Sequence, residues 1–175
     1  MADHIDNGLA AAIKALDDVV AKSIDPSNPL AREQLKLVTR YLGFLRQRLP
    51  HRAEHERFEL AHYTTLGSDL LPMSESIVVP GAPSLAAAVQ AGQLVLDAAS
   101  ATTLQVQQAV DALTSAISVL VRASAHADAP IRRRIELQVT RASAALFDVR
   151  RAWYMPMGFE PDPGQVPSLD QALAR

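Results

Sequence analysis

Apolar residues recur at helical spacing along nearly the whole chain. In the first segment, about residues 3–24, they return every three or four positions: Ile5, Leu9, Ile13, Leu16, Val20 and Ile24. Residues three and four apart share one face of an α-helix, so this pattern predicts an amphipathic helix. The turn-forming run DPSNP, residues 25–29, is expected to end it.

A second helix is predicted to begin after Asn28, with Pro29 in its first turn, where proline loses no hydrogen bond. Its apolar stripe is Val38, Tyr41, Leu42, Leu45 and Leu49. Pro50 follows, and a proline inside a helix costs about 3 kcal/mol or more and kinks or ends it. Residues 51–66 are therefore expected to lie beyond a kink or to form a new helix.

The segment 67–83, GSDLLPMSESIVVPGAP, contains two glycines and three prolines and shows no sustained period. A long unstructured connection of this kind is uncommon inside a compact domain, where it is usually a lid, a binding loop or a linker. The other interpretation is a crossover connection that runs the length of a helix bundle. We expect a proline-rich loop, and either role fits.

Three more helices are predicted, from about Ser84, from Thr102 and from Asp128. Thr102 and Gln105 have the spacing of a capping box, and Asp128 precedes Pro130. The last two helices carry seams of coiled-coil type. These seams are Val106, Val110, Leu113, Ile117, Leu120 and Ser124, and then Ile131, Ile135, Val139, Ala142, Leu146, Val149 and Trp153.

Small residues gather on the helix after Ser84 and just beyond it: Ala86, Ala87, Ala88, Ala91, Gly92, Ala98 and Ala99. They would allow close helix packing within the chain, and the same surface could serve a helix-to-helix dimer. The fold class predicted is all-α, a helical bundle of about five main helices with a long crossover loop. We assign residues 1–154 to the bundle, with the loop at 67–83, and residues 155–175 to an irregular C-terminal arm packed on it.

Composition narrows the classes of function. With 49% hydrophobic residues the 175-residue chain can bury a core, and its formal charge of −2 offers no polycationic surface for specific nucleic-acid binding. It has no cysteine, which excludes disulfides and thiolate chemistry. The acidic N-terminus does not resemble a signal peptide, and no run approaches 18 apolar residues. We expect a cytoplasmic protein without a membrane span.

The stretch HRAEHERFELAH, residues 51–62, concentrates three of the five histidines. On a helix with 100° per residue, six side chains fall within about 100° of one another. They are His51, His55, Phe58, Glu59, His62 and Leu66. Because Phe58 and Leu66 are apolar, this face is expected to point inward and to line a ligand pocket.

His51, His55, Glu59 and His62 are also candidate metal ligands, since imidazole and carboxylate groups four apart can meet at one ion. Two familiar patterns are incomplete, however. The zinc motif His-Glu-x-x-His fails because position 59 is glutamate, and the Glu-x-x-His element of di-iron bundles has no second copy. A metal or haem thus remains a candidate cofactor that nothing in the sequence requires.

Two alternatives need no metal. In an enzyme, His55 or His62 would be the general base and Glu59 would orient it. Otherwise the histidines form a partly buried polar stripe in which Glu59 accepts their hydrogen bonds. The sequence leaves catalysis open.

The segment 152–161, AWYMPMGFEP, holds the only tryptophan, and the chain is only 5% aromatic. Trp153 and Tyr154 either close one end of the bundle as a hydrophobic plug or form the apolar wall of a ligand pocket. Arginines between 131 and 153 avoid the predicted seam. They are expected to face solvent or to form a patch for an acidic partner.

The leading functional hypothesis is helix-mediated association, as a homo-oligomer or as an accessory subunit of another protein. The two seams and the small-residue faces motivate it. The alternative is a bundle that binds a small molecule or cofactor, perhaps as an enzyme, in a pocket lined by histidine and glutamate. Its ligand-binding candidates are His51, His55, Phe58, His62, Trp153 and Tyr154.

Overall fold

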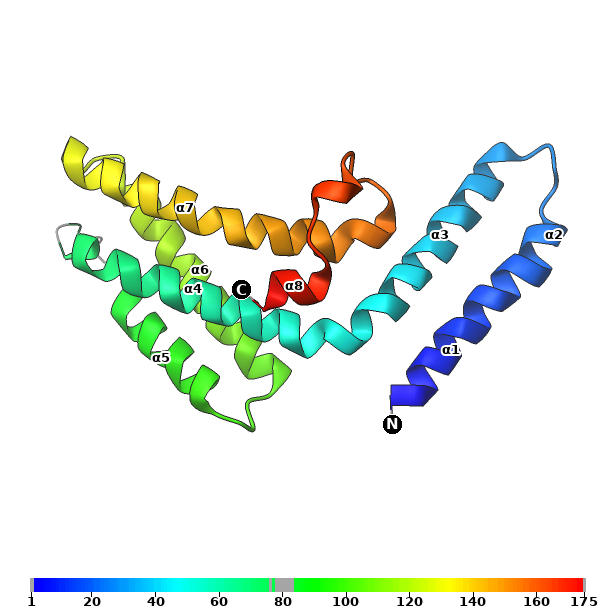
Figure 1. The fold of residues 1–175 in the computed structure, drawn as a ribbon, viewed down its shortest axis with the longest axis horizontal. Coiled ribbons are helices and arrows are strands. Elements are labelled where there is room, and N and C mark those ends of the chain that lie inside the picture. Colours follow the sequence, from blue (N-terminus) through cyan, green and yellow to red (C-terminus); the bar gives the residue numbers. More distant parts are fainter. Residues whose placement is uncertain (1, 76, 78–83, 175) are drawn as a thin grey trace. The chain divides into compact units, whose positions relative to one another are not determined.

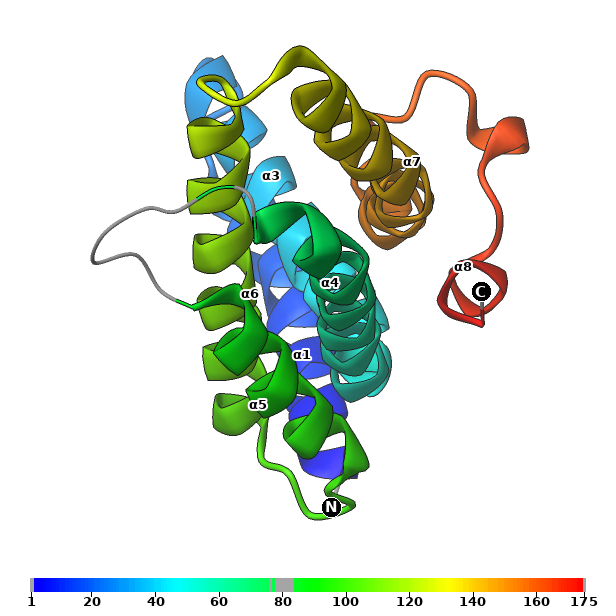
Figure 2. The same ribbon diagram turned by 90° about the vertical axis from the view of Figure 1, so that its left-hand side faces the viewer.

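A computed structural model describes residues 2–75, 77 and 84–174 of the chain, and these are helical nearly throughout, with no strand among them (Figures 1 and 2). The predicted all-α helical bundle is confirmed. The chain divides into two compact units, described separately below. Unit 1 comprises residues 1–52 and 150–169, and unit 2 comprises residues 53–149 and 170–175.

Unit 1 is built on a helical hairpin (Figure 1). Its first arm is α1, Ala2–Ala15, continued by a π-helical segment, Leu16–Val20, and by α2, Ala21–Ser23. The second arm is α3, Pro29–Arg48, which the Asn28 side chain caps by accepting a 3.0 Å hydrogen bond from the amide of Ala31. Both predicted helices and the predicted cap are confirmed.

The predicted break at Pro50 is a 3₁₀ turn, Leu49–His51, after which α4 runs from Arg52 to Ser74. The remainder of unit 1 begins in the last turn of α7, Ala129–Tyr154, and continues through two 3₁₀ turns, Met155–Met157 and Pro163–Gln165. Arg151 and Glu160 join these parts through an ion pair of 2.7 Å.

The prediction of a loop from 67 to 83 is wrong for residues 67–74, which complete α4. Pro72 lies inside this helix, and the buried side chains of Leu70 and Met73 offset its cost. Gly67 serves helix packing instead of a turn, because a Cβ there would lie 2.7 Å from Cγ2 of Val89. Residues 76 and 78–83 of the expected lid or connection lie outside the described residues.

Unit 2 packs α4 and α7 with α5, Leu85–Asp97, and α6, Thr103–Ser124, around one core (Figure 2). The two predicted seams supply much of that core: Leu113 and Ile135 are fully buried. α6 begins at the predicted capping box. The amide of Gln105 donates to Oγ1 of Thr102 at 3.3 Å, and the amide of Thr102 donates to Oε1 of Gln105 at 2.8 Å.

Small residues on α5 allow α4 to approach closely. A Cβ on Gly92 would lie 2.7 Å from Oγ1 of Thr64 and 3.0 Å from Cδ1 of Leu113, and Ala88 is buried beside it. Ala87 and Ala91 are exposed. Packing within the chain therefore uses part of the small-residue face.

Within the described chain, α6 is the one helix long and apolar enough to cross a membrane by length and composition. Seven residues of α6 are buried, six of them in the hydrophobic core of unit 2. The short α8, Leu169–Leu173, has Ala172 and Leu173 buried. The assignment of residues 1–154 to the bundle and 155–175 to a C-terminal arm stays a prediction; by contacts, residues 155–169 group with unit 1 and 170–175 with unit 2.

Candidate functional site

A groove of about 700 Å³ runs along α4 within unit 2. Residues 54, 58, 61, 62, 65 and 69 line it from α4, because steps of three and four place them on one side of the helix. Gln138, Arg141 and Ala142 of α7 form the opposite wall, and Leu173 of α8 also lines the groove. Its volume falls in the range of about 300–1,000 Å³ that is usual for ligand sites.

Two of the predicted site residues meet in this groove. The rings of Phe58 and His62 stack with centroids 6.1 Å apart and an interplanar angle of 18°. Tyr63 meets His62 edge-on at 5.3 Å. Both Phe58 and His62 are half-buried.

Glu59 lies on another side of α4. It lines a separate cavity of about 150 Å³ with Val106 and Val110 of α6. Glu59 and His62 therefore do not share one of these two cavities, and His55 lines neither. The glutamate that lines the groove beside His62 is Glu54, whereas Glu59 lines the cavity next to α6.

The metal hypothesis receives no geometric support. Among the described residues, which include His51, His55, Glu59 and His62, no three histidine, aspartate or glutamate side chains gather closely enough to hold an ion. His51 belongs to unit 1, in the 3₁₀ turn before α4. Spacings of four, four and three along the chain do not bring the ligand atoms of these groups to one point.

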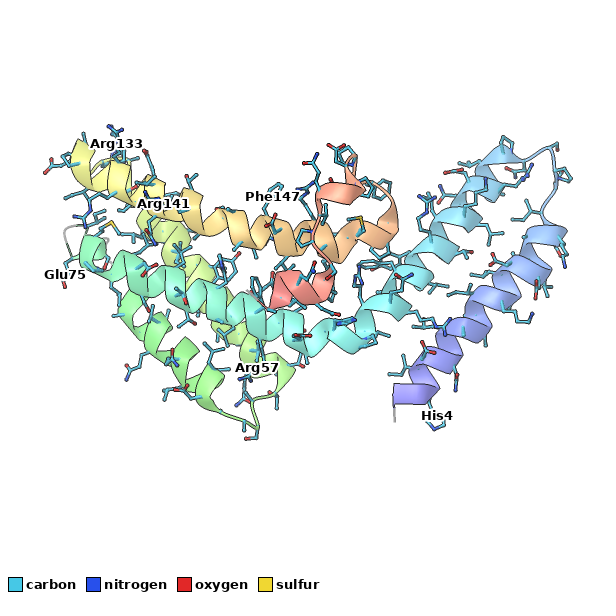
Figure 3. All side chains as sticks on the ribbon, viewed as in Figure 1. His4, Arg57, Glu75, Arg133, Arg141 and Phe147 are labelled. Carbon is cyan, nitrogen blue, oxygen red and sulfur yellow. The ribbon has the colours of Figure 1, made fainter. Side chains whose placement is uncertain are left out.

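Two hydrogen bonds join the helices that form the walls of the groove. Arg57 of α4 donates from Nη2 to the carbonyl oxygen of Leu96 at 2.6 Å, and Gln138 of α7 donates to Oδ2 of Asp69 at 2.7 Å. Arg57 and Arg141 are labelled in Figure 3. The first contact closes the C-terminal end of α5 onto α4, and the second ties α7 to α4.

Trp153 and Tyr154 lie in unit 1, not with the groove residues of unit 2. Phe44 of α3 stacks on Tyr154 at 5.6 Å and meets Trp153 edge-on at 6.5 Å. Arg48 sits 5.7 Å from the Trp153 ring centroid and donates from Nε to the Trp153 carbonyl at 2.6 Å. Burial lowers the pKa of the Arg48 guanidinium. These contacts pack the end of α7 on α3, as a hydrophobic plug would.

A feature that sequence analysis missed lies on the hairpin of unit 1. Of residues 4–52, Phe44 is the one that is buried, although both helices carry the predicted apolar stripes. Six large apolar side chains at the tip half of the hairpin are 39–69% exposed: Val19, Val20, Leu30, Leu37, Val38 and Tyr41. We call these six the tip surface.

The geometry of α3 explains the exposure. Leu35 and Leu42 are half-buried on the side of α3 toward α1. The four tip-surface residues of α3 occupy the adjoining arc of about 100°. One neighbouring helix covers about one such arc, so α3 has apolar surface for two neighbours. Near Phe44, Trp153 and Tyr154 supply the second neighbour. Along residues 30–41 the side chains of the arc are 39–69% exposed.

The π-helical segment contributes to the same surface. A π turn contains about one residue more than an α turn, so the residues after it rotate by roughly 100° relative to an unbroken helix. Val20 belongs to the predicted inward stripe but is 41% exposed, and Val19 beside it is 63% exposed. The sequence predicted which residues form the apolar stripe of the first helix. It did not predict the π turn that rotates part of this stripe.

No family model, curated protein or solved structure matches this chain.

Proposed function

We propose that this protein acts by helix-mediated association and that the hairpin of unit 1 is its association surface. The observation that supports this most directly is the uncovered apolar arc of α3, residues 30–41, beside exposed Val19 and Val20. Burying a Val, Leu or Ile side chain contributes about 1.5–3 kcal/mol. A partner helix that covers several of these side chains would therefore gain several such contributions to the free energy of association.

The proposed association surface is the hairpin, not the seams and small-residue faces on which the association hypothesis was first based. The seams of α6 and α7 are largely committed to the core of unit 2, as Leu113, Ile117 and Ile135 illustrate. Gly92 and Ala88 are likewise buried within the chain. A surface that already packs inside its own unit is not available to a partner. The tip-surface side chains are 39–69% exposed, although Tyr41 also stacks on Phe44.

The experiment places a photo-crosslinking amino acid at Val38 in the full chain, with Leu104 as the control position. Both side chains are exposed aliphatic groups on helices, 48% and 62%, but Leu104 lies on α6 of unit 2. We expect crosslinked protein from position 38 and little from 104. Equal yields from the two positions, or none from 38, would refute the proposal.

A polar variant of the same residue gives the matching equilibrium measurement. Val38→Glu places a charge in the proposed interface, where its desolvation is expected to weaken association at least tenfold. Light scattering during size-exclusion chromatography measures the effect, and Leu104→Glu is the control. Association that survives Val38→Glu unchanged would count against the hairpin.

The groove in unit 2 carries a second candidate function, the binding of a small molecule against Phe58 and His62. Its volume and the stacked rings support it. Thermal-shift screening of the wild type against His62→Ala would test it, with elemental analysis and an absorption spectrum to examine metal and haem. A ligand that stabilises both proteins equally would argue against this groove. Either function is proposed for the cytoplasm, with no nucleic acid or membrane as partner.

A further inference from the structure

One face of α7 within unit 2 combines positive charge with an exposed apolar centre. That centre is Leu137, whose side chain is 48% exposed. Three exposed arginines lie three or four positions from it in the sequence: Arg133, Arg134 and Arg141. On a helix with 100° per residue they fall within about 60° of Leu137, so they surround it. Exposed Ala144 lies on the same side, two turns after Leu137. We call these five residues the arginine face, and Figure 3 labels Arg133 and Arg141.

Neighbouring carboxylates do not neutralise this face. Among the described residues, no hydrogen bond or ion pair joins its three arginines to an acidic side chain. Glu136 points about 100° away from the centre of the face and pairs with Arg132 at 3.8 Å. Asp69, which lines the adjoining groove, accepts a hydrogen bond from Gln138 at 2.7 Å. Asp148 is half-buried and lies about 10 Å further along the helix than the last of these arginines.

We infer that the arginine face binds an acidic segment of a partner protein. The segment is an amphipathic helix that places an apolar side chain on Leu137 and carboxylates on the surrounding arginines. Guanidinium groups hold carboxylates through two parallel hydrogen bonds, which lysine cannot form. This face is separate from the hairpin, because it belongs to unit 2 and the hairpin to unit 1.

The apolar centre favours a protein partner over water or nucleic acid. Solvation of a helix requires polar side chains at the centre of its outer face, where this face has Leu137 and Ala144. A phosphate backbone is bound by basic and polar groups and gains little from an exposed leucine. Protein interfaces are enriched in arginine, and their strongest contacts consist of buried anchors enclosed by a rim that excludes water.

The length of the face determines a suitable probe. Residues 133–144 extend over about 16 Å of helix, which a partner helix of about 11 residues would match. An isolated helix of that length is marginal in water, so the probe needs about 16 residues. We choose a fluorescently labelled synthetic peptide with leucine at every third or fourth position and with glutamate and alanine elsewhere. Its leucines then occupy one side of the helix.

Fluorescence anisotropy measures binding of this peptide to the full-length protein. Arg133→Glu with Arg141→Glu reverses two charges of the arginine face, and we expect a Kd at least tenfold above that of the wild type. The control is Arg32→Glu with Lys36→Glu, which reverses two exposed charges on α3. Both variants change the net charge of the chain equally. We expect the control to raise the Kd less than about twofold, because long-range repulsion is screened by salt.

A second comparison tests the apolar centre without changing any charge. Leu137→Ala should raise the Kd by about three- to tenfold, because the peptide loses an apolar contact. Leu104→Ala removes another exposed leucine of unit 2, on α6, and should leave the Kd unchanged. All the substituted side chains are exposed, and circular dichroism confirms that each variant is folded. Equal Kd values for the two leucine variants would mean attraction by charge alone and would overturn the inference.

Three further results would also overturn it. The first is an absence of peptide binding in the micromolar range, and the second is an equal loss of binding in the two charge-reversed variants. The third is a mixed-sequence DNA duplex that binds the wild type more tightly than the peptide does, since this would assign the face to nucleic acid. If Val38→Glu weakens peptide binding and the substitutions on α7 do not, the arginine face is excluded and association through the hairpin stands.

Discussion

The two units carry similar apolar periodicity and bury it to very different extents. In unit 2, thirteen residues form one buried core cluster, which includes fully buried Leu113 and Ile135. In unit 1, of residues 4–52 and 150–169, Phe44 and Ala152 are the ones buried. The difference follows from the number of helices. Helices packed on several sides enclose a core between them, whereas two helices can bury only the faces they turn to each other.

The largest effect should come from the core of unit 2. Leu113→Ala removes a fully buried side chain that lies beside Gly67 and Gly92, and we expect a loss of about 3–5 kcal/mol in the free energy of unfolding. Urea denaturation followed by circular dichroism measures it. Leu104→Ala on the same helix removes a side chain that is 62% exposed, and should change stability by less than about 0.5 kcal/mol. Similar losses for both would show that unit 2 lacks the tight core described.

Phe44→Ala should damage unit 1 and leave unit 2 folded. It removes the ring that contacts Tyr41, Trp153 and Tyr154, at a cost of about 3 kcal/mol, near the low end for Phe→Ala because the surrounding rings are partly exposed. Trp153 is the only tryptophan, so its fluorescence reports unit 1. We expect its transition to move to lower urea while the amide exchange of α6 stays slow. A parallel loss of protection in α6 would mean that the units unfold as one.

A pair of glycine substitutions compares packing between the units. A Cβ at Gly92 meets Thr64 and Leu113, so Gly92→Ala should lose about 1–2 kcal/mol even after its gain in helix propensity. Gly43 in α3 has nothing within 4 Å of the position of a Cβ. Gly43→Ala should therefore stabilise unit 1 by roughly 0.5–1 kcal/mol. Thermal unfolding measures whether each substitution lowers or raises the stability. A change of the same sign in both variants would show that the two glycines do not differ in packing.

The smallest effect concerns pH. Hydrogen bonds from Arg151 lower the pKa of Glu160, whose side chain is 11% exposed. Because the folded pKa lies below the unfolded value of about 4.3, the pair stabilises unit 1 above that pH and loses its contribution as the pH falls through the folded pKa. Trp153 fluorescence between pH 5 and 2 should show an acid transition (a range set by those carboxyl pKa values). Glu160→Gln should remove the part of it due to this pair, while an unchanged profile would argue that the pair contributes nothing.

The sequence correctly predicted the structural features that depend only on residues close together in the chain. The Asn28 cap, the Thr102–Gln105 capping box and the break at Pro50 are all present, because each depends on contacts within about one helical turn. The same local rules failed at residues 67–74. Gly67 and Pro72 usually mark a loop, but contacts with α5 and the burial of Leu70 keep this segment helical.

The histidine face shows the same limit. Helical spacing correctly predicted that Phe58 and His62 would share a side of α4, and their rings stack there. It could not predict that Glu59 would turn to a cavity beside α6, since the directions of neighbouring helices decide which narrow arc each side chain enters. Ligand sites require convergence within a few ångströms, and a pattern along one helix does not determine that.

The sequence by itself determined the helices of this protein, most of their ends and which side of each is apolar. These properties depend on residue spacing, on side-chain caps and on proline geometry, all of which act over one or two turns. Only the tertiary structure decided which apolar sides are buried. Val38 and Leu113 look alike in the sequence, each in an apolar stripe. Their burial differs because Leu113 lies in a core enclosed by several helices, whereas Val38 lies on a two-helix hairpin and stays 48% exposed.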